Sequence, residues 1–199
     1  MTKTIDYYFS VNSPWTYLGH ARFVEIARRA GAHVAVKPVD MARVFAASGG
    51  LPVAQRPRQR QLYRMAELRR WRAHLGIPIN LEPRHARVPT GMAARLVIAA
   101  DLRDLNALAL VGFLGRAVWE EERDVSDPAT LKAIVAEHGR NAELLWEAAQ
   151  SPEVASAHDA YTQEAIDREV FGAPTYAYRD ELFWGQDRLE FLERALASN

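Results

Sequence analysis

The sequence has no cysteine among its 199 residues. This absence excludes disulfide bonds, thiolate metal sites, a cysteine nucleophile and any CxxC redox chemistry run by the chain itself. Long apolar runs are also missing, because the most apolar stretch, Leu105–Val118, is broken by Gly112, Gly115 and Arg116 and is too short to span a bilayer. No charged leader precedes an apolar segment at the N-terminus. We therefore expect a cytoplasmic globular protein with one domain-sized core and no membrane partner.

Lysine is scarce, since only three of the 25 basic residues are lysine, and the charges are unevenly distributed. Residues 41–95 carry eleven basic and two acidic side chains, whereas residues 96–199 carry nine basic and twenty acidic ones. The basic region predicts an anionic partner. Biased genome composition explains the preference for arginine more simply than phosphate recognition does. No nucleic-acid recognition motif accompanies the charge, so nucleic acid is not expected as a partner.

The first forty residues have the pattern of a βαβ unit. Thr4–Phe9 reads as a strand, Ser13 fits a helix N-cap, and Pro14 fits the first helical position, where the missing N–H costs nothing. The helix is expected to end at Gly31, and Val34–Val36 follows as a second short strand. A strand, a helix and a strand in so short a segment imply a parallel strand pair.

The pattern then changes to helix only, and returns to strands near the C-terminus. Helical spacing and stop signals predict a helix with Leu62, Met65, Leu68, Trp71 and Leu75 on one face, and further helices over 92–102, 106–121, 126–139, 141–150 and from 151 to before Gly172. Residues 174–178 and 181–184 read as a β-hairpin before a last helix through Leu189, Leu192 and Leu196. The expected fold is α/β: a thioredoxin-like βαβ…αββα domain formed by 1–40 and 151–199, with a large all-helical insertion domain over 41–150.

Three short elements could carry chemistry. Ser13 lies where a helix offers unpaired N–H groups and the positive end of its dipole, although it could be only a cap. In Gly172–Thr175 a cis peptide before Pro174 would free the Ala173 backbone to pair with an extended ligand, although a helix stop followed by a strand start explains the same residues. Trp184–Arg188 forms a second helix entrance that could hold an α-amino acid head group, although an aspartate there is usually a cap.

Taken together these elements resemble a known family. The segment Tyr8–Leu18, with its Ser-Pro-Trp-Thr-Tyr element, resembles the start of the 2-hydroxychromene-2-carboxylate isomerases and the related kappa-class glutathione transferases. In that family this element takes the place of CxxC in a DsbA-like thioredoxin fold. The likeness continues through Val36–Val39, Arg70–Trp71 and Gly76–Pro78, and is clearest in Val170–Thr175 followed by Leu182–Leu189.

The resemblance implies glutathione as the working thiol and Ser13 as the catalytic residue, its hydroxyl hydrogen-bonding the glutathione sulfur. It places the remaining glutathione-binding positions at Ala173, Pro174, Trp184, Gly185, Gln186 and Asp187. The implied reaction is the interconversion of 2-hydroxychromene-2-carboxylate and trans-o-hydroxybenzylidenepyruvate, by reversible thiolate addition, in aromatic hydrocarbon catabolism. A homodimer is also implied.

Matches in the substrate pocket are poorer. Val44 and His85 fall where, or near where, the family has substrate-binding residues, and Ala54–Arg56 departs from a polar pair found in some relatives. The six histidines lack metal-ligand spacing, so no metal is expected. Two alternatives stay open: a kappa-like glutathione transferase that consumes glutathione, and a non-catalytic module that binds glutathione or a peptide.

Overall fold

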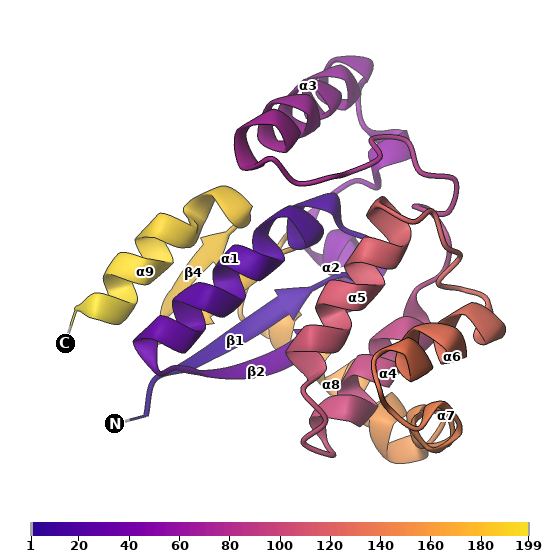
Figure 1. The fold of residues 1–199 in the computed structure, drawn as a ribbon. Coiled ribbons are helices and arrows are strands. Elements are labelled where there is room, and N and C mark those ends of the chain that lie inside the picture. Colours follow the sequence, from indigo (N-terminus) through magenta and orange to yellow (C-terminus); the bar gives the residue numbers. More distant parts are fainter. Residues whose placement is uncertain (1, 199) are drawn as a thin grey trace.

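The computed structural model describes residues 2–198, and its centre is a mixed four-stranded sheet in the order β2-β1-β3-β4 (Figure 1). The strands are β1 (Thr4–Phe9), β2 (His33–Pro38), β3 (Thr175–Tyr178) and β4 (Glu181–Trp184). β1 pairs parallel with β2 and antiparallel with β3, and β4 is antiparallel to β3. This is the predicted βαβ…αββα frame, with the C-terminal hairpin added to the edge of the N-terminal unit.

Helix α1 (Pro14–Ala30) connects β1 to β2, and its ends follow from its sequence. The Ser13 side chain accepts a hydrogen bond from the Thr16 N–H at 3.3 Å, so Ser13 is the N-cap. Pro14 occupies the first turn, and Gly31 ends the helix with a left-handed φ of 60°.

The chain between the two halves of the sheet is helical, as predicted. It forms α2 (Met41–Ser48), a short 3-10 turn (Val53–Gln55), α3 (Arg58–Leu75), α4 (Gly91–Asp101), α5 (Ala107–Trp119), α6 (Pro128–Glu137), α7 (Ala142–Ala149) and α8 (Pro152–Asp167), and after the hairpin come η2 (Gln186–Arg188) and α9 (Leu189–Ala197). The sequence patterns did not identify α2 as a separate helix. Within residues 2–198, no helix is both long enough and apolar enough to cross a membrane.

The two faces of the sheet carry different cores. On one face, Tyr7 and Phe9 pack in a large cluster with residues of α1 and α9, and this cluster continues without a break into α4 and α5. On the other face, Tyr8 and Ala177 belong to a smaller cluster with residues of α2 and α8. Because the larger core includes helices of the expected insertion, the division at residues 40 and 150 into two domains stays a prediction.

Helix α3 rises away from the sheet and packs mainly against α1 (Figure 1). Only part of its predicted apolar face is covered: Leu68 is fully buried and Met65 and Trp71 are partly buried, whereas Leu62 is 55% exposed. The pattern correctly predicted a helix but overestimated how much of it packs, because the N-terminal half of α3 extends beyond the rest of the molecule.

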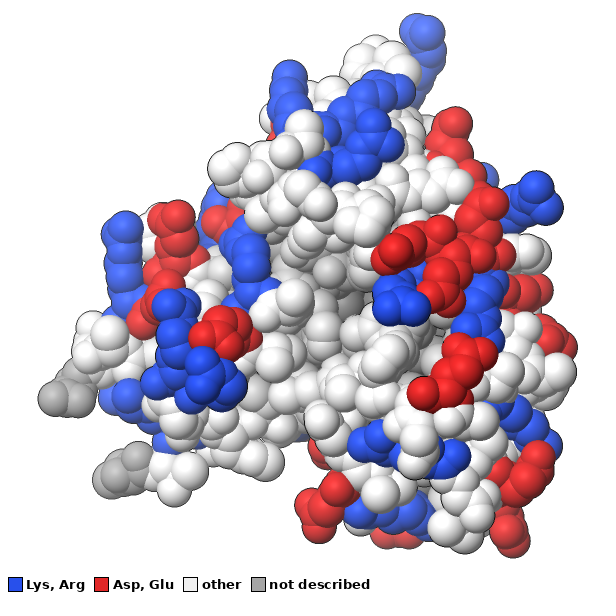
Figure 2. Space-filling model, viewed as in Figure 1, with Lys and Arg blue, Asp and Glu red and all other residues white. Residues whose placement is uncertain are grey.

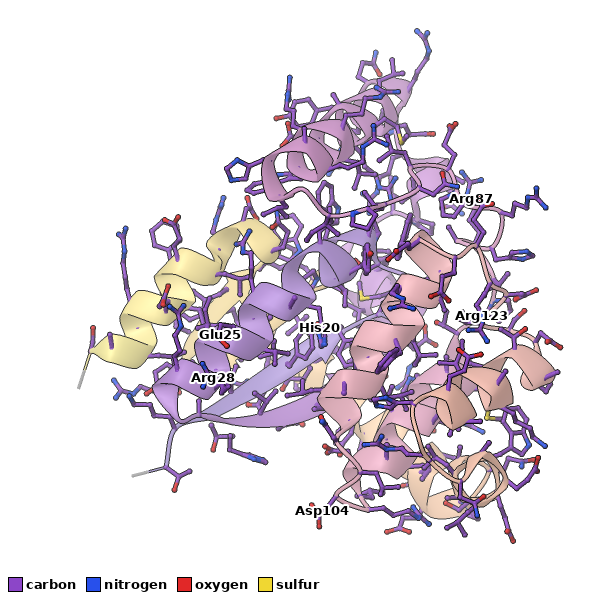
Figure 3. All side chains as sticks on the ribbon, viewed as in Figure 1. His20, Glu25, Arg28, Arg87, Asp104 and Arg123 are labelled. Atoms are coloured by element: carbon purple, nitrogen blue, oxygen red, sulfur yellow. The ribbon has the colours of Figure 1, made fainter. Side chains whose placement is uncertain are left out.

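His20 is a buried polar residue between α1 and α5 (Figure 3). Its Nε2 lies 2.8 Å from the Leu108 carbonyl oxygen, which requires Nε2 to carry the proton. Its Nδ1 lies 3.4 Å from the Tyr7 hydroxyl. Burial lowers the pKa of His20 to about 4, although the Leu108 hydrogen bond favours the charged form. His20 is therefore a neutral bridge between the two helices.

This burial predicts a loss of stability on the acid side. The folded pKa of about 4 lies below the ordinary histidine value of 6.5, so the unfolded chain binds the proton first as pH falls. The stability contributed by His20 is complete above pH ~6.5 and decreases by about 3 kcal/mol by pH ~4. In urea unfolding at pH 7 and pH 4.5, we expect wild type to lose about 2 to 3 kcal/mol more than His20→Gln, which keeps a donor for Leu108 without a titrating ring. Equal losses in the two proteins would contradict the assignment.

Candidate active site

Ser13 and Ala173, which lie 160 residues apart in sequence, meet at one end of the sheet. The Ser13 hydroxyl donates to the Ala173 carbonyl oxygen at 3.2 Å. The register explains the meeting, because Tyr8 pairs with Thr175, so the loop after β1 and the loop before β3 leave the sheet side by side. The Ala173–Pro174 peptide bond is cis.

The backbone of Ala173 keeps one free hydrogen-bonding group beside Ser13. Its carbonyl accepts from Ser13, but within residues 2–198 its N–H donates to no protein acceptor. Both residues are partly exposed. An unpaired backbone donor next to a hydroxyl at a helix start is an arrangement that can bind the backbone of an extended peptide.

The third predicted element joins the same site through Gly185. Its N–H donates to the Pro174 carbonyl oxygen at 2.8 Å, so the turn after β4 is fixed to the loop before β3. The following Gln186 is 1% exposed and is held by Arg22 of α1. The Arg22 guanidinium donates to the Gln186 side-chain oxygen at 3.2 Å and to its backbone oxygen at 2.9 Å. The sequence patterns missed Arg22, because nothing local distinguishes it from the other arginines.

Trp184 and Asp187 form the exposed rim of this element. The Trp184 ring is half exposed and packs edge to face on Phe171, with centroids 4.7 Å apart. Gly172 lets the indole approach, since a Cβ there would lie 2.3 Å from Trp184 Nε1. The Asp187 carboxylate pairs with Arg188 at 2.7 Å. The structure thus brings Ser13, the Ala173 loop and the Gly185 turn together, as the sequence led us to expect.

The two residues predicted to bind substrate, Val44 and His85, form no hydrogen bond with Ser13 or Ala173 within residues 2–198. Val44 is fully buried in the smaller core with Tyr8. The His85 ring lies 3.4 Å from the Asp124 carboxylate. The next residue, Ala86, does contact the site, because its carbonyl accepts from the Asn12 side-chain amide at 3.2 Å. A substrate role for Val44 and His85 stays a prediction.

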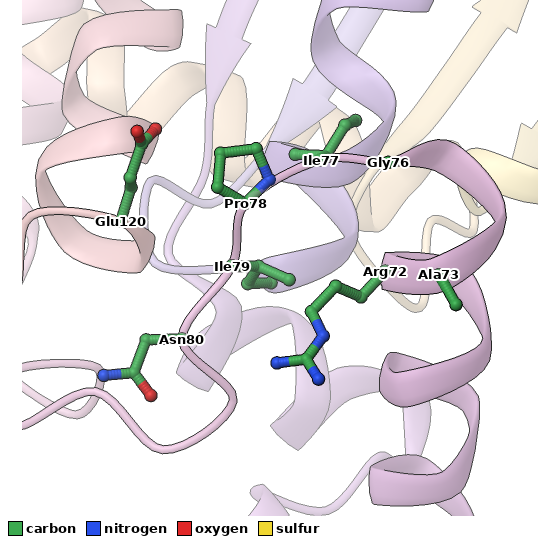
Figure 4. A pocket seen from close by; sticks show the side chains of 8 residues that line it. All are labelled: Arg72, Ala73, Gly76, Ile77, Pro78, Ile79, Asn80 and Glu120. Atoms are coloured by element: carbon green, nitrogen blue, oxygen red, sulfur yellow. The ribbon is translucent and has the colours of Figure 1, made fainter.

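Two cavities flank α1, and neither is lined by Ser13 or Ala173. One, of about 590 Å³, lies between α1, α3 and α9 and meets the site at Arg22 and Asp187. The other, of about 680 Å³, lies between the end of α3, the segment after it and the end of α5; its lining is shown in Figure 4 and consists of Arg72, Ala73, Gly76, Ile77, Pro78, Ile79, Asn80 and Glu120.

Tyr17, one turn beyond Ser13, connects α1 to two residues that line the second cavity. Its hydroxyl donates to the Pro78 carbonyl oxygen at 2.8 Å and lies 3.3 Å from the Glu120 carboxylate. Burial, followed by the charge of Glu120, raises the pKa of Tyr17 to about 12. The phenol is therefore a neutral donor that holds the segment after α3 against α1.

Charge is divided across the face seen in Figure 2. Blue side chains gather over α3, red ones lie near the end of α5, and the surface between them is largely uncharged. Among the residues that the structure describes, no three His, Cys, Asp or Glu side chains are grouped so that they could hold a metal ion. The polar groups that the site presents are the Ser13 hydroxyl, backbone amides, the Asp187 carboxylate and arginines.

Comparison with known proteins places this arrangement in a family. The model of the DSBA-like thioredoxin domain matches residues 4–197. A 2-hydroxychromene-2-carboxylate isomerase from Sphingobium xenophagum is 32% identical over 199 residues, which cover 98% of this chain and 99% of that protein. The chain belongs to the 2-hydroxychromene-2-carboxylate isomerase family of DSBA-like thioredoxin domains. This confirms the resemblance seen in the sequence.

Two further comparisons agree with membership of this isomerase family. A solved structure of a 2-hydroxychromene-2-carboxylate isomerase superposes with a TM-score of 0.80 at 29% identity, covering 98% of this chain and 94% of that one. A kappa-class glutathione S-transferase from Homo sapiens is 26% identical over 208 residues, covering 98% of this chain and 92% of that protein. The isomerase fold and the kappa-class relationship therefore extend over the whole chain.

The geometry of Gly185 predicts a specific sensitivity. Its φ of 98° with ψ of 153° is a conformation that only glycine adopts readily, and an added Cβ would lie 2.5 Å from the Asp187 carboxylate. We expect Gly185→Ala to lower the free energy of unfolding by about 2 to 3 kcal/mol. The control Gly31→Ala, at a left-handed position with open space around it, should cost only about 1 kcal/mol. Equal losses in urea unfolding would show that the turn is not constrained in this way.

Proposed function

We propose that this chain is a glutathione-dependent isomerase that interconverts 2-hydroxychromene-2-carboxylate and trans-o-hydroxybenzylidenepyruvate. The observation that carries the proposal is the Ser13 hydroxyl, 3.2 Å from the Ala173 carbonyl and beside an unpaired Ala173 N–H, in a chain without cysteine. A helix start with a hydroxyl and a free backbone donor can bind a thiolate, and because the chain has no cysteine, that thiol would arrive with a ligand. The names of its isomerase and kappa-class relatives support the same choice.

The residues present fit the peptide backbone of glutathione. The free Ala173 N–H can donate to the carbonyl of a cysteinyl residue, in the manner of an added strand. The Gln186 and Asp187 N–H groups open the turn after β4 and donate to no acceptor within residues 2–198, so they can bind a carboxylate. The exposed Asp187 side chain can accept from an ammonium group. A γ-glutamyl group presents both a carboxylate and an ammonium, so its charges match this turn.

Bound glutathione supplies a thiolate that adds reversibly to an electrophilic carbon and leaves again, which allows rotation about the former double bond without net redox change. The task of the protein is to favour the thiolate. A free thiol with pKa ~8.5 is about 3% ionised at pH 7, so full ionisation gains at most about thirtyfold. Any larger acceleration must come from holding sulfur and substrate in contact.

Two features at Ser13 can supply this gain. The start of α1 stabilises an anion by ~0.3–1 kcal/mol where exposed and up to ~2 kcal/mol where partly buried, and no acidic residue in its first turn opposes this. The Ser13 hydroxyl can turn from the Ala173 carbonyl to the sulfur, which adds ~1.5–3 kcal/mol for a charged acceptor. Together they account for the ~2 kcal/mol that full ionisation requires.

The resemblance also implies a homodimer, and the lack of a long apolar run in the sequence led us to expect a cytoplasmic location; both stay predictions. The aromatic substrate would lie under the helices that cover the start of α1, where Asn12 contacts the loop at Ala86. Substrate binding by Val44 is expected to be indirect, since this side chain is fully buried.

Replacing the hydroxyl tests the central role of Ser13. We expect Ser13→Ala to lower kcat/KM about 10- to 100-fold, corresponding to the lost bond to a charged sulfur, and to raise the apparent thiol pKa measured from the pH dependence. Ser151→Ala is a matched control, because Ser151 caps α8 before a proline with the same 3.3 Å side-chain bond and lies outside the site. The assay follows 2-hydroxychromene-2-carboxylate by absorbance with and without glutathione. A wild-type rate that does not depend on glutathione would exclude the mechanism.

The kappa-class relative makes a transferase the second candidate. An isomerase returns its thiol at every turnover, whereas a transferase consumes one thiol for each product molecule. We expect the glutathione concentration, measured with a thiol reagent, to stay constant over many turnovers of substrate. A stoichiometric fall would instead identify a transferase. Glutathione binding with no activity toward either substrate class, and no effect of Ser13→Ala, would identify a binding module.

A further inference from the structure

Arg64 on α3 is a partly buried cation without a counter-charge. Its only hydrogen-bond partner among residues 2–198 is the Met65 sulfur at 3.9 Å, a weak acceptor. Three other partly buried cations each pair closely with a carboxylate: Lys37 with Glu164 at 2.6 Å, Arg123 with Glu137 at 2.7 Å and Arg168 with Asp6 at 2.5 Å. Among residues 2–198, Arg64 has no such partner.

Two more arginines add to the positive charge at this place. Burial, followed by the charges of Arg56 and Arg87, lowers the pKa of the Arg64 guanidinium. Arg56 is oriented by a 2.8 Å bond from its Nε to the Leu51 carbonyl oxygen and by the Phe45 ring 5.8 Å away. Within residues 2–198 none of the three guanidinium groups has a carboxylate within 4.0 Å. Like charges held together without compensation reduce stability, and a bound anion would remove that cost.

This arginine cluster, defined as Arg56, Arg64 and Arg87, lies beside the start of α1. Arg87 directly follows Ala86, whose carbonyl accepts from the side chain of Asn12, the residue before Ser13. A bond from the Ser10 hydroxyl to Asn12 Oδ1 at 2.9 Å orients the Asn12 amide for this contact. Arg87, labelled in Figure 3, lies in the loop between α3 and α4. Through the backbone at Ala86, Arg87 is therefore linked to the residue that precedes Ser13.

We propose that the arginine cluster is a carboxylate-binding subsite, with Arg64 as its central donor, and that it selects anionic ligands for the candidate active site. The role of the cluster in catalysis rests on the proposed function, whereas its ability to bind a carboxylate does not depend on that function. A guanidinium can donate two parallel hydrogen bonds to a carboxylate, and flanking positive charges strengthen them. Two ligands of the reaction carry such a group, the aromatic substrate and the glycyl end of glutathione, and binding experiments can separate them.

The test compares Arg64→Met with wild type and with Arg69→Met, a control that removes an exposed arginine from the same helix. Calorimetry measures binding of trans-cinnamate, its uncharged amide, glutathione, and the glycyl monoethyl ester of glutathione. If the subsite takes the substrate carboxylate, Arg64→Met weakens cinnamate about tenfold and leaves the amide and glutathione unchanged. If it takes the glycyl carboxylate, Arg64→Met weakens glutathione about tenfold, and the ester binds wild type and variant equally. Arg69→Met changes neither affinity.

Stability provides the second readout. Removing an uncompensated charge should leave the Tm of Arg64→Met unchanged or raise it, whereas loss of a structural arginine would lower it. Unchanged affinity for all four probes, or a lowered Tm with unchanged affinity, overturns the proposal. Because these are equilibrium measurements, they do not require turnover. If Arg64→Met weakens anion binding but the wild-type protein does not isomerise the substrate, the subsite is supported and only the proposed function is contradicted.

Discussion

The antiparallel pairing of β1 with β3 is the constraint on which the site depends. It sets Tyr8 opposite Thr175, and thereby brings the Ser13 hydroxyl to the Ala173 carbonyl. β1 and β3 are also the two inner strands of the sheet, covered on both faces by the two cores. The precision of the site therefore comes from the most buried part of the structure, and the partly exposed loops that carry Ser13 and Ala173 need only short connections to reach each other.

The fold and the main residues of the site could be predicted because their signals are local. A serine followed by proline identifies the start of α1, Gly31 identifies its end, and alternating apolar residues identify the hairpin strands. The resemblance added the grouping of Ser13 with Ala173. The extent of packing was less predictable, since Leu62 has the spacing of a buried residue but is exposed on a helix that extends beyond the core.

Residues that act across the fold left no such signal. Arg22 supports Gln186 from 164 positions away, and Asn12 reaches Ala86 across 74 positions. Neither contact follows from periodicity, capping or composition. His85 shows the opposite case: its position drew attention in the sequence, but its ring lies against Asp124. The arginine-rich segment was visible as a charge imbalance, and only the structure shows that Arg64 is partly buried with no carboxylate partner among residues 2–198.

The position of β3 has a consequence for how the molecule is made. This inner strand comes from the last quarter of the chain, so a growing polypeptide exposes one flank of β1 throughout most of its synthesis. Until Thr175–Tyr178 has been synthesised, the helices within residues 41–167 can pack only against an incomplete sheet. Neither the pairing of β1 with β3 nor the contact between Ser13 and Ala173 can form before then. Contacts that span so much sequence form slowly, so we expect the contact between Ser13 and Ala173 to form late in folding.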